Sequence, residues 1–402
     1  MLVNRGYKFK ILPTDEQIKQ FIQYFGCSRK VYNLYVNELY NYLDSTNYTD
    51  GKIEGFKVCS PKRFKQNYSY LKYCDSLALC NAEINFKKAL RNYNKESYKK
   101  VYTKKSKRRL ENQGITPTYK DLKGIPRFKS RKNGDFSYTT NNQSHNGKWN
   151  DIVLEDKMLK LPKFKTFIKV KQHRPLPNNS IIKNATISMD ARGVFYVSLC
   201  VEYEVAEPKK IPSIKTLGLD YSQKDFYVDN EGKKANYPHY YKKSQEKLAK
   251  LQRQLSKKEF DSNNYKKLKK KIAVLHGKIA NQRLDWIHKE TTRLANEYDA
   301  IFVEDINLRN LGECLSLGKN LHDNGFGMFR TILAYKLEER GKQFIKIDKT
   351  FASTKTCNCC GNKKDIKLQD RWYICELCGY EADRDINAAK NIKDFGTRLL
   401  AW

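Results

Sequence analysis

Two Cys-x-x-Cys pairs near the C-terminal end carry the plainest chemistry in this sequence. Each pair is followed by glycine, and the four cysteines are Cys357, Cys360, Cys375 and Cys378. Four thiolates at this spacing can close a tetrahedral Zn²⁺ site, and glycine lets the backbone turn so that its amides face the sulfurs. The spacing therefore predicts a structural zinc site. Because Cys359 stands directly before Cys360, either cysteine could be the second ligand of the first pair.

Acidic residues at three places in the chain could form a second metal site. Residues 215–220 (KTLGLD) and 299–304 (DAIFVE) each look like a buried strand that ends in a carboxylate. After the second cysteine pair, Asp383, Arg384 and Asp385 open a segment of good helix formers. Folding can gather two strand-end acids and one helix-start acid into an all-oxygen site for Mg²⁺ or Mn²⁺. Two such ions would clamp the attacking and leaving oxygens of a phosphodiester.

The charge balance points to a polyanionic partner. The 402 residues include 78 Lys and Arg against 44 Asp and Glu, a formal net charge of +34. A compact fold with this excess repels itself unless a polyanion neutralises it, so nucleic acid is the expected partner. The 27 Tyr and 19 Phe could add base stacking. A basic composition inherited from an A·T-rich genome is the alternative.

Composition also bounds the class of protein. A hydrophobic content of 40% favours a globular protein with two or three domains, and no apolar run approaches the ~18 residues of a membrane span. The start shows no signal peptide, so no membrane partner is expected. Eleven cysteines, an odd number, favour a reducing cytosol over a disulfide framework. We therefore expect a cytoplasmic protein, with a monomer favoured although no segment specifies the oligomeric state.

The pattern of apolar residues changes along the chain. Residues 13–124 carry apolar residues at helical spacing, including the stretch 64–93, and contain a dense basic run at 98–109. That run is either a solvated loop or a phosphate clamp. Residues 126–204 are short alternating runs split by Gly, Pro and Asn, which predicts a barrel or sandwich that residues 1–12 would join. Residues 240–258 and 263–298 predict an antiparallel helix pair with a leucine-rich seam.

The motifs in combination resemble one protein family. GLDYS around Asp220, VEDINLRNL around Glu304 and DRDINAAKNI after the second cysteine pair are similar to motifs of the TnpB (OrfB) proteins. Bacterial insertion sequences encode these proteins, which are related to the type V CRISPR effector nucleases. NQRLDWIHKET at residues 281–291 and PRFKSRK at residues 126–132 match as well, so the resemblance covers nearly the whole chain. Ser222 departs from the pattern, since many relatives have glycine there.

The resemblance implies an α+β multidomain fold. Residues 1–12 and 125–210 would form a split β-barrel (wedge) domain, with a helical recognition domain inserted at 13–124. An RNase H-like (RuvC) α/β nuclease domain would comprise residues 211–350 and 383–402, including the helical hairpin 240–298. A zinc-ribbon module that binds target nucleic acid would lie between them at 351–382. The resemblance also favours Cys360 over Cys359 as a zinc ligand and Asp385 over Asp383 as the third catalytic acid. Asp383 would then either cap the helix or hold a metal ligand in place through a hydrogen bond.

For function, the resemblance implies an RNA-guided DNA endonuclease. Asp220, Glu304 and Asp385 would be its catalytic residues and hold Mg²⁺ or Mn²⁺. A guide RNA from the transposon end would pair with double-stranded target DNA, next to a short flanking motif that the N-terminal lobe reads. We expect nucleic-acid contacts from a set of basic residues: Lys99, Lys100, Lys104, Lys105, Arg127, Lys129, Arg131 and Arg384. A nuclease-inactive RNA-guided repressor and a transposase that joins strands remain as alternatives.

Overall fold

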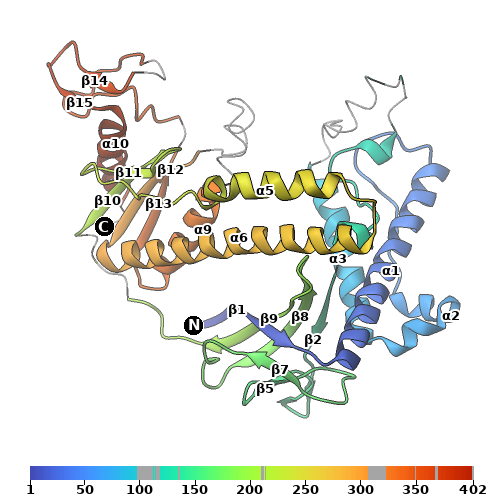
Figure 1. Ribbon diagram of the computed structural model, residues 1–402. Helices are drawn as coiled ribbons and strands as arrows, with labels where there is room; N and C mark the ends of the chain where they lie inside the picture. The colour runs from blue at the N-terminus through green and yellow to red at the C-terminus, as the bar shows by residue number, and fades with distance from the viewer. Residues whose placement is uncertain are drawn as a thin grey trace. The chain divides into compact units, whose positions relative to one another are not determined.

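The computed structural model describes residues 1–96, 112, 114, 118–134, 136–209, 212, 214–306, 323–348, 350–366 and 370–400. The chain divides into two compact units, residues 1–205 and residues 206–402 (Figure 1). Each unit has its own main sheet and its own hydrophobic core. The basic run at 98–109, with Lys99, Lys100, Lys104 and Lys105, lies outside the described residues.

The first unit is built on a seven-stranded antiparallel sheet. Its strands, in spatial order, are β2 (Ser137–Asn141), β8 (Ile181–Met189), β9 (Phe195–Glu204), β1 (Leu2–Leu12), β7 (Ile168–Lys171), β6 (Met158–Lys160) and β5 (Val153–Glu155). The prediction that residues 1–12 join the later strands is confirmed, because β1 pairs with both β9 and β7. Within the described part of the chain, the strand pairings leave β2 and β5 as sheet edges, so closure into a barrel stays a prediction.

Helices pack on this sheet and share its core. The first is α1 (Asp15–Ser45), which begins after Thr14 with a capping box between Thr14 and Gln17. Phe21 of α1 stacks on Phe195 of β9 with 5.7 Å between the ring centroids. A second helix, α3 (Ser76–Glu96), contacts both α1 and β2. Strands and helices of this unit therefore form one hydrophobic cluster.

The continuous helical spacing predicted over residues 64–93 is broken in the structure. This stretch holds a short helix, α2 (Phe64–Asn67), then a 3-10 turn (Ser69–Tyr73), and only then α3. The carboxylate of Asp75 accepts a hydrogen bond from the backbone N–H of Leu77 at 3.1 Å. Because a side chain of this kind caps a helix start, α3 begins here as a separate element.

The second unit is built on a four-stranded mixed sheet. Its order is β11 (Phe226–Asp229), β10 (Thr216–Ser222), β12 (Ala300–Glu304) and β13 (Gln343–Ile347). β10, β12 and β13 run parallel, and β11 pairs antiparallel with β10. Alternate residues of β12 face two cores: Ile301 and Val303 join the helices α6 (Asn263–Glu297) and α9 (Phe326–Glu338), while Phe302 joins α10 (Arg384–Arg398).

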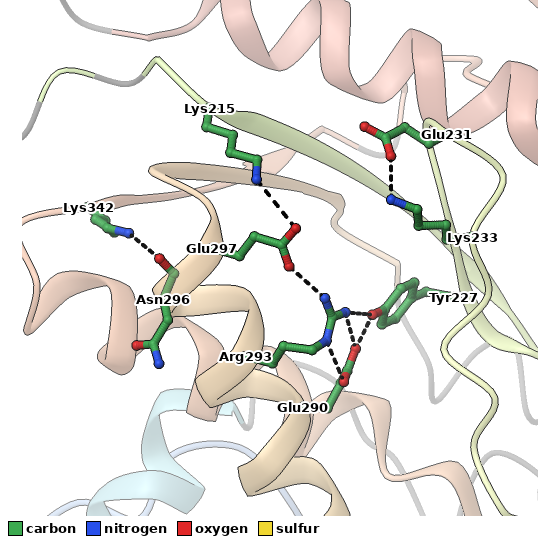
Figure 2. Close-up of polar contacts among 9 residues, drawn as sticks. All are labelled: Lys215, Tyr227, Glu231, Lys233, Glu290, Arg293, Asn296, Glu297 and Lys342. Carbon is green, nitrogen blue, oxygen red and sulfur yellow. Dashed lines mark hydrogen bonds and ion pairs between the residues drawn. The ribbon is translucent and has the colours of Figure 1, made fainter.

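A helical hairpin extends from this sheet. The predicted antiparallel helix pair is confirmed: α5 (Tyr240–Ser256) packs along α6, and the two helices lie side by side in Figure 1. A polar network anchors the C-terminal end of α6 (Figure 2). Arg293 donates to Glu290 at 2.7 Å, to Glu297 at 2.8 Å and to the hydroxyl of Tyr227 on β11 at 3.2 Å. This end of the hairpin is therefore fixed to the sheet.

A small β-hairpin precedes the last helix. It consists of β14 (Trp372–Ile374) and β15 (Glu381–Asp383), which pair antiparallel and lead directly into α10. In the part of the chain that the structure describes, no helix is long and apolar enough to cross a membrane.

Candidate active site and zinc centre

Asp220 and Glu304 lie at neighbouring positions on two parallel strands. Leu219 of β10 is the partner of Val303 of β12, so the next residue on each strand is one of the two acids. Neighbouring strands are about 4.8 Å apart, and side chains at equivalent positions of parallel strands point to the same face. Glu304 ends its strand as predicted, but β10 continues two residues past Asp220 to Ser222 because it also pairs with β11.

Two glycines bring α10 close to these strands. A side-chain carbon added at Gly218, two residues before Asp220, would lie 2.7 Å from the backbone nitrogen of Lys393 and nearer still to the carbonyl oxygen of Ala389. One added at Gly396 would collide with the ring of Phe302. The helix can therefore rest directly on the sheet face that carries the acids. Neither glycine was predicted from the sequence, although Gly218 lies inside an apolar strand, where a glycine signals close backbone approach.

Asp385 stands in the first turn of α10. Asp383 caps the helix, accepting hydrogen bonds from the backbone N–H groups of Asp385 at 2.9 Å and Ile386 at 3.3 Å, which confirms its predicted capping role. The guanidinium of Arg384 lies against Asp385, with nitrogen-to-Oδ1 distances of 3.2 and 3.3 Å. Nη1 of Arg371, from the residue before β14, is 3.9 Å from Oδ2 of Asp385.

The charges of Glu304 and Asp385 act on the carboxyl of Asp220. Burial raises the pKa of Asp220 well above its ordinary range, the charges of Asp385 and Glu304 raise it further, and Arg384 lowers it. The pKa of Glu304 is also raised, because the effect of its burial outweighs the lowering by a hydrogen bond with Ser353. Buried carboxylates that disfavour one another's negative charge are relieved by a cation between them. Carboxylate oxygens are the ligands that Mg²⁺ and Mn²⁺ prefer, so the chemistry of these side chains suits such an ion. Among the described residues, the group whose ligand atoms already lie close enough to hold a metal is that of the four cysteines.

Four cysteine sulfurs form a compact cluster. The Sγ atoms of Cys357, Cys360, Cys375 and Cys378 all lie within 4.8 Å of one another. The Sγ–Sγ distance is 3.7 Å between Cys357 and Cys378 and 3.6 Å between Cys360 and Cys375. A tetrahedron with Zn–S bonds of about 2.3 Å has edges of about 3.8 Å, so the cluster fits Zn²⁺. Cysteine spacing allowed either Cys359 or Cys360 as the second ligand. The structure favours Cys360, since the exposed Cys359 is not part of this cluster.

The two cysteine pairs have the same backbone geometry. The N–H of Gly361 donates to the carbonyl of Cys357, and the N–H of Gly379 donates to that of Cys375, both at 3.0 Å. Both glycines have positive φ, 77° and 70°, a conformation that side chains rarely adopt. Backbone N–H groups of Cys378 and Leu377 lower the pKa of Cys375 to about 6. Burial and the neighbouring thiols raise the pKa of Cys360 and Cys378, as expected of sulfurs held this close together.

A buried set of asparagines ties the first cysteine pair to α10. Asn391 donates to the carbonyls of Ser353 at 2.8 Å and Thr356 at 2.6 Å, and Asn387 also donates to Thr356 at 2.8 Å. In return, Asn358 donates from its backbone to Asn387 at 3.1 Å and from its side chain to Asn391 at 3.2 Å. The cysteine cluster and the helix that carries Asp385 are thus one connected structure. Sequence analysis did not single out Asn391; its spacing four residues after Asn387 on one helix face was the available signal.

The predicted nucleic-acid contacts are placed only in part. Arg127 donates to the carbonyls of Lys120 at 3.3 Å and Leu122 at 3.4 Å. Nζ of Lys129 lies 4.2 Å from the ring centroid of Tyr32. Arg131 is exposed at the start of a 3-10 turn. Their contacts with nucleic acid stay a prediction, as does that of Arg384, which lies beside Asp385.

Three protein-family models match parts of the chain. They are described as "Helix-turn-helix domain" (residues 1–46), "Probable transposase" (residues 198–314) and "Cas12f1-like, TNB domain" (residues 326–392). In the structure, residues 1–46 contain β1 and the single continuous helix α1. The third match covers the cysteine cluster, the asparagines and Asp385.

Relatives of known name match the chain over most of its length. A protein of Streptomyces pristinaespiralis is 28% identical over 400 residues, which cover 99% of this chain and 91% of the relative. A protein of Escherichia coli (strain K12) is 31% identical over 293 residues, 69% of this chain and 70% of the relative. Both are named "Putative RNA-guided DNA endonuclease", the second with the addition InsQ. The chain belongs to the TnpB (OrfB) family.

A solved structure has a similar fold. The chain resembles the Cas12f1 protein in "Cryo-EM structure of the Cas12f1-sgRNA-target DNA complex" with a TM-score of 0.55, covering 98% of this chain and 99% of that one. At 13% sequence identity this is a likeness of fold. It relates the mixed α/β architecture of the family to that of a type V effector.

Proposed function

We propose that the protein is a metal-dependent endonuclease that a guide RNA directs to complementary DNA. The observation that carries the proposal is the convergence of Asp220, Glu304 and Asp385 from two parallel strands and the helix packed on them. Relatives named as RNA-guided DNA endonucleases support the guided activity. The net charge of +34 supports nucleic-acid partners. We assign the second unit to the RNase H-like (RuvC) class on its mixed sheet and the order of its acids.

The three acids would hold two Mg²⁺ or Mn²⁺ ions, which supply the charge that stabilises the attacking and leaving oxygens of a phosphodiester during hydrolysis. The side chains themselves bind and orient. Asp383 fixes the first helical turn and with it the backbone of Asp385. Arg384 and Arg371 place positive charge beside Asp385, where guanidinium groups can pair with phosphate oxygens.

The cysteine cluster would hold a structural Zn²⁺ and so stabilise residues 351–382 against α10. With four protein thiolates it has no open position for substrate, which is the arrangement of a structural site. Because the chain belongs to the TnpB family, we further propose that the wedge and recognition domains within residues 1–205 recognise a short DNA motif that flanks the target. On the same basis and on its cysteine content, the protein would act as a monomer in the bacterial cytosol.

Guide-programmed cleavage tests this proposal. The protein would be produced with RNA from the 3′ flank of its own gene, carrying a chosen guide sequence, and given Mg²⁺ and plasmids with that target beside randomised flanks. We expect cuts confined to matched targets with one enriched flank. Binding to matched targets without cuts would instead identify a repressor, and covalent joining of donor ends would identify a transposase. Either result would overturn the endonuclease proposal.

A further inference from the structure

The free end of the α5–α6 hairpin holds a basic hollow. Four lysines line it, Lys257 and Lys258 at the end of α5 and Lys267 and Lys271 on the first turns of α6. Its volume is about 460 Å³, within the roughly 300–1,000 Å³ of typical ligand sites. All four side chains are exposed. Four ammonium groups around one hollow repel one another unless an anion lies among them.

The basic side chains at the two ends of the hairpin differ in how many acidic partners they have. At the sheet end, basic side chains are neutralised within the protein: Arg293 pairs with Glu290 and Glu297, and Lys215 also pairs with Glu297 (Figure 2). At the free end, residues 254–271 hold seven lysines and two acids. Among the described residues, the one ion pair there joins Lys266 to Asp261 at 3.2 Å, and none involves the four lysines of the hollow. Their charge is directed outward.

An aromatic side chain stands in the loop that joins the two helices. Phe260 is 74% exposed, and its ring lies 5.3 Å from that of Tyr265 between centroids. An exposed ring next to unpaired lysines is what nucleic-acid surfaces combine, because bases stack on aromatic faces while ammonium groups meet the backbone. If the ligand were an acidic protein, the lysines alone would match its charge and the exposed Phe260 would have no role.

We infer that this hollow grips the phosphodiester backbone of a nucleic acid strand. The inference rests on the nucleic-acid partner in the proposed function but not on cleavage. α5 begins after His239, whose ring nitrogen lies 2.8 Å from the carbonyl of Lys224 in the turn that follows the Asp220 strand. Its 17 residues rise about 25 Å to the hollow. At about 3.4 Å per nucleotide of one strand, the contact falls about seven nucleotides from that turn.

The salt dependence of binding tests the inference. Affinities of the full-length protein for a DNA duplex and for an RNA strand would be measured across a salt series without added divalent ions. The slope of log K against log salt is negative, and each lost phosphate contact lowers its magnitude by about 0.7–0.9. We expect a decrease of about 1.5 for K267Q/K271Q and about 3 when K257Q/K258Q are added. The four Lys→Arg substitutions keep the charge and should restore the wild-type slope.

The matched control is K233Q/K289Q. It removes two lysines of the same unit that are already paired, with Glu231 at 2.7 Å and Asp285 at 2.8 Å, so its slope should stay within about 0.5 of the wild type. The nucleic acid whose slope decreases, DNA or RNA, identifies the strand held. An unchanged slope on both in the four-lysine variant overturns the inference. A wild-type protein that binds neither contradicts the proposed function itself, whereas tight binding in the salt series together with no cleavage of a guide-matched target in Mg²⁺ contradicts only the nuclease.

Discussion

Replacing Gly218 with alanine should displace the helix that carries Asp385. The added carbon would lie 2.7 Å from the backbone nitrogen of Lys393, and even closer to the carbonyl oxygen of Ala389, where ordinary contact needs at least 3.4 Å. These are backbone atoms of α10, so no side chain can rotate away. The helix must therefore move by about 0.7 Å or more relative to β10.

Both stability and chemistry should respond. Overpacking of this kind costs about 1–3 kcal/mol, and each kcal/mol lowers the melting temperature of a unit of this size by about 2–4 °C. A misplacement near 1 Å can cost about 10²-fold in rate. Because Gly218 and Asp220 lie on the same face of β10, we expect cleavage to slow by about 10- to 100-fold while affinity for target DNA is unchanged.

Single-turnover cleavage of a guide-matched duplex, with thermal melting and target binding beside it, measures these effects. Gly26→Ala is the matched control: an alanine there meets nothing within 4 Å, and alanine stabilises a helix interior relative to glycine. Cleavage by Gly218→Ala at the wild-type rate, with wild-type melting, would refute the close packing of α10 as a requirement for the site.

Three other changes test separate parts of the structure. Asp220→Asn should raise the melting temperature of the metal-free protein at neutral pH by a few degrees. The pKa of Asp220 is raised in the folded protein, so its carboxyl stabilises the fold below the unfolded pKa of about 3.9. That stabilisation is lost as the pH rises through the pKa of the folded state, and asparagine, which has no charge, avoids the loss. Melting as steeply dependent on pH as in the wild type would contradict this. Cys375→Ser should abolish zinc binding, as measured by metal analysis, whereas the exposed Cys359→Ser should keep it; unchanged zinc in the first would remove Cys375 from the ligand set. Asn391→Ala leaves the carbonyl of Ser353 without its donor, whereas the carbonyl of Thr356 keeps Asn387. Because an unpaired buried carbonyl costs about 1–3 kcal/mol, melting should fall by several degrees and hydrogen exchange around the first cysteine pair should rise; exchange equal to that of the wild type would refute the role of Asn391 in holding this pair to α10.

Local patterns in the sequence were enough for much of the site. Two Cys-x-x-Cys-Gly units predict a metal cluster because the geometry is set by a few consecutive residues, as the matching hydrogen bonds of Gly361 and Gly379 illustrate. The strand at 300–304 and the helix start at Asp383 were also readable, since apolar runs and capping residues act locally. The helical hairpin followed from its long leucine periodicity.

Features that depend on distant parts of the chain were not readable. Gly218 matters because α10, some 170 residues later, packs against it; a glycine inside an apolar strand signals a close approach but not which segment makes it. The extension of β10 past Asp220 depends on its pairing with β11. In both cases tertiary packing overrides a local preference. The start of α3 differs from these, because the cap that Asp75 forms is local and could have been predicted from the sequence.

The central claim is that Asp220, Glu304 and Asp385 perform the cleavage, and one comparison tests it most directly. Wild-type protein and Asp220→Ala would be loaded with the same guide RNA and compared for cleavage and binding of a matched duplex in Mg²⁺. We predict that Asp220→Ala binds the target within about twofold of the wild type and yields no cut product, because removing one carboxylate disrupts the metal site and not the nucleic-acid surface. Cleavage by Asp220→Ala at the wild-type rate would contradict the assignment of the active site.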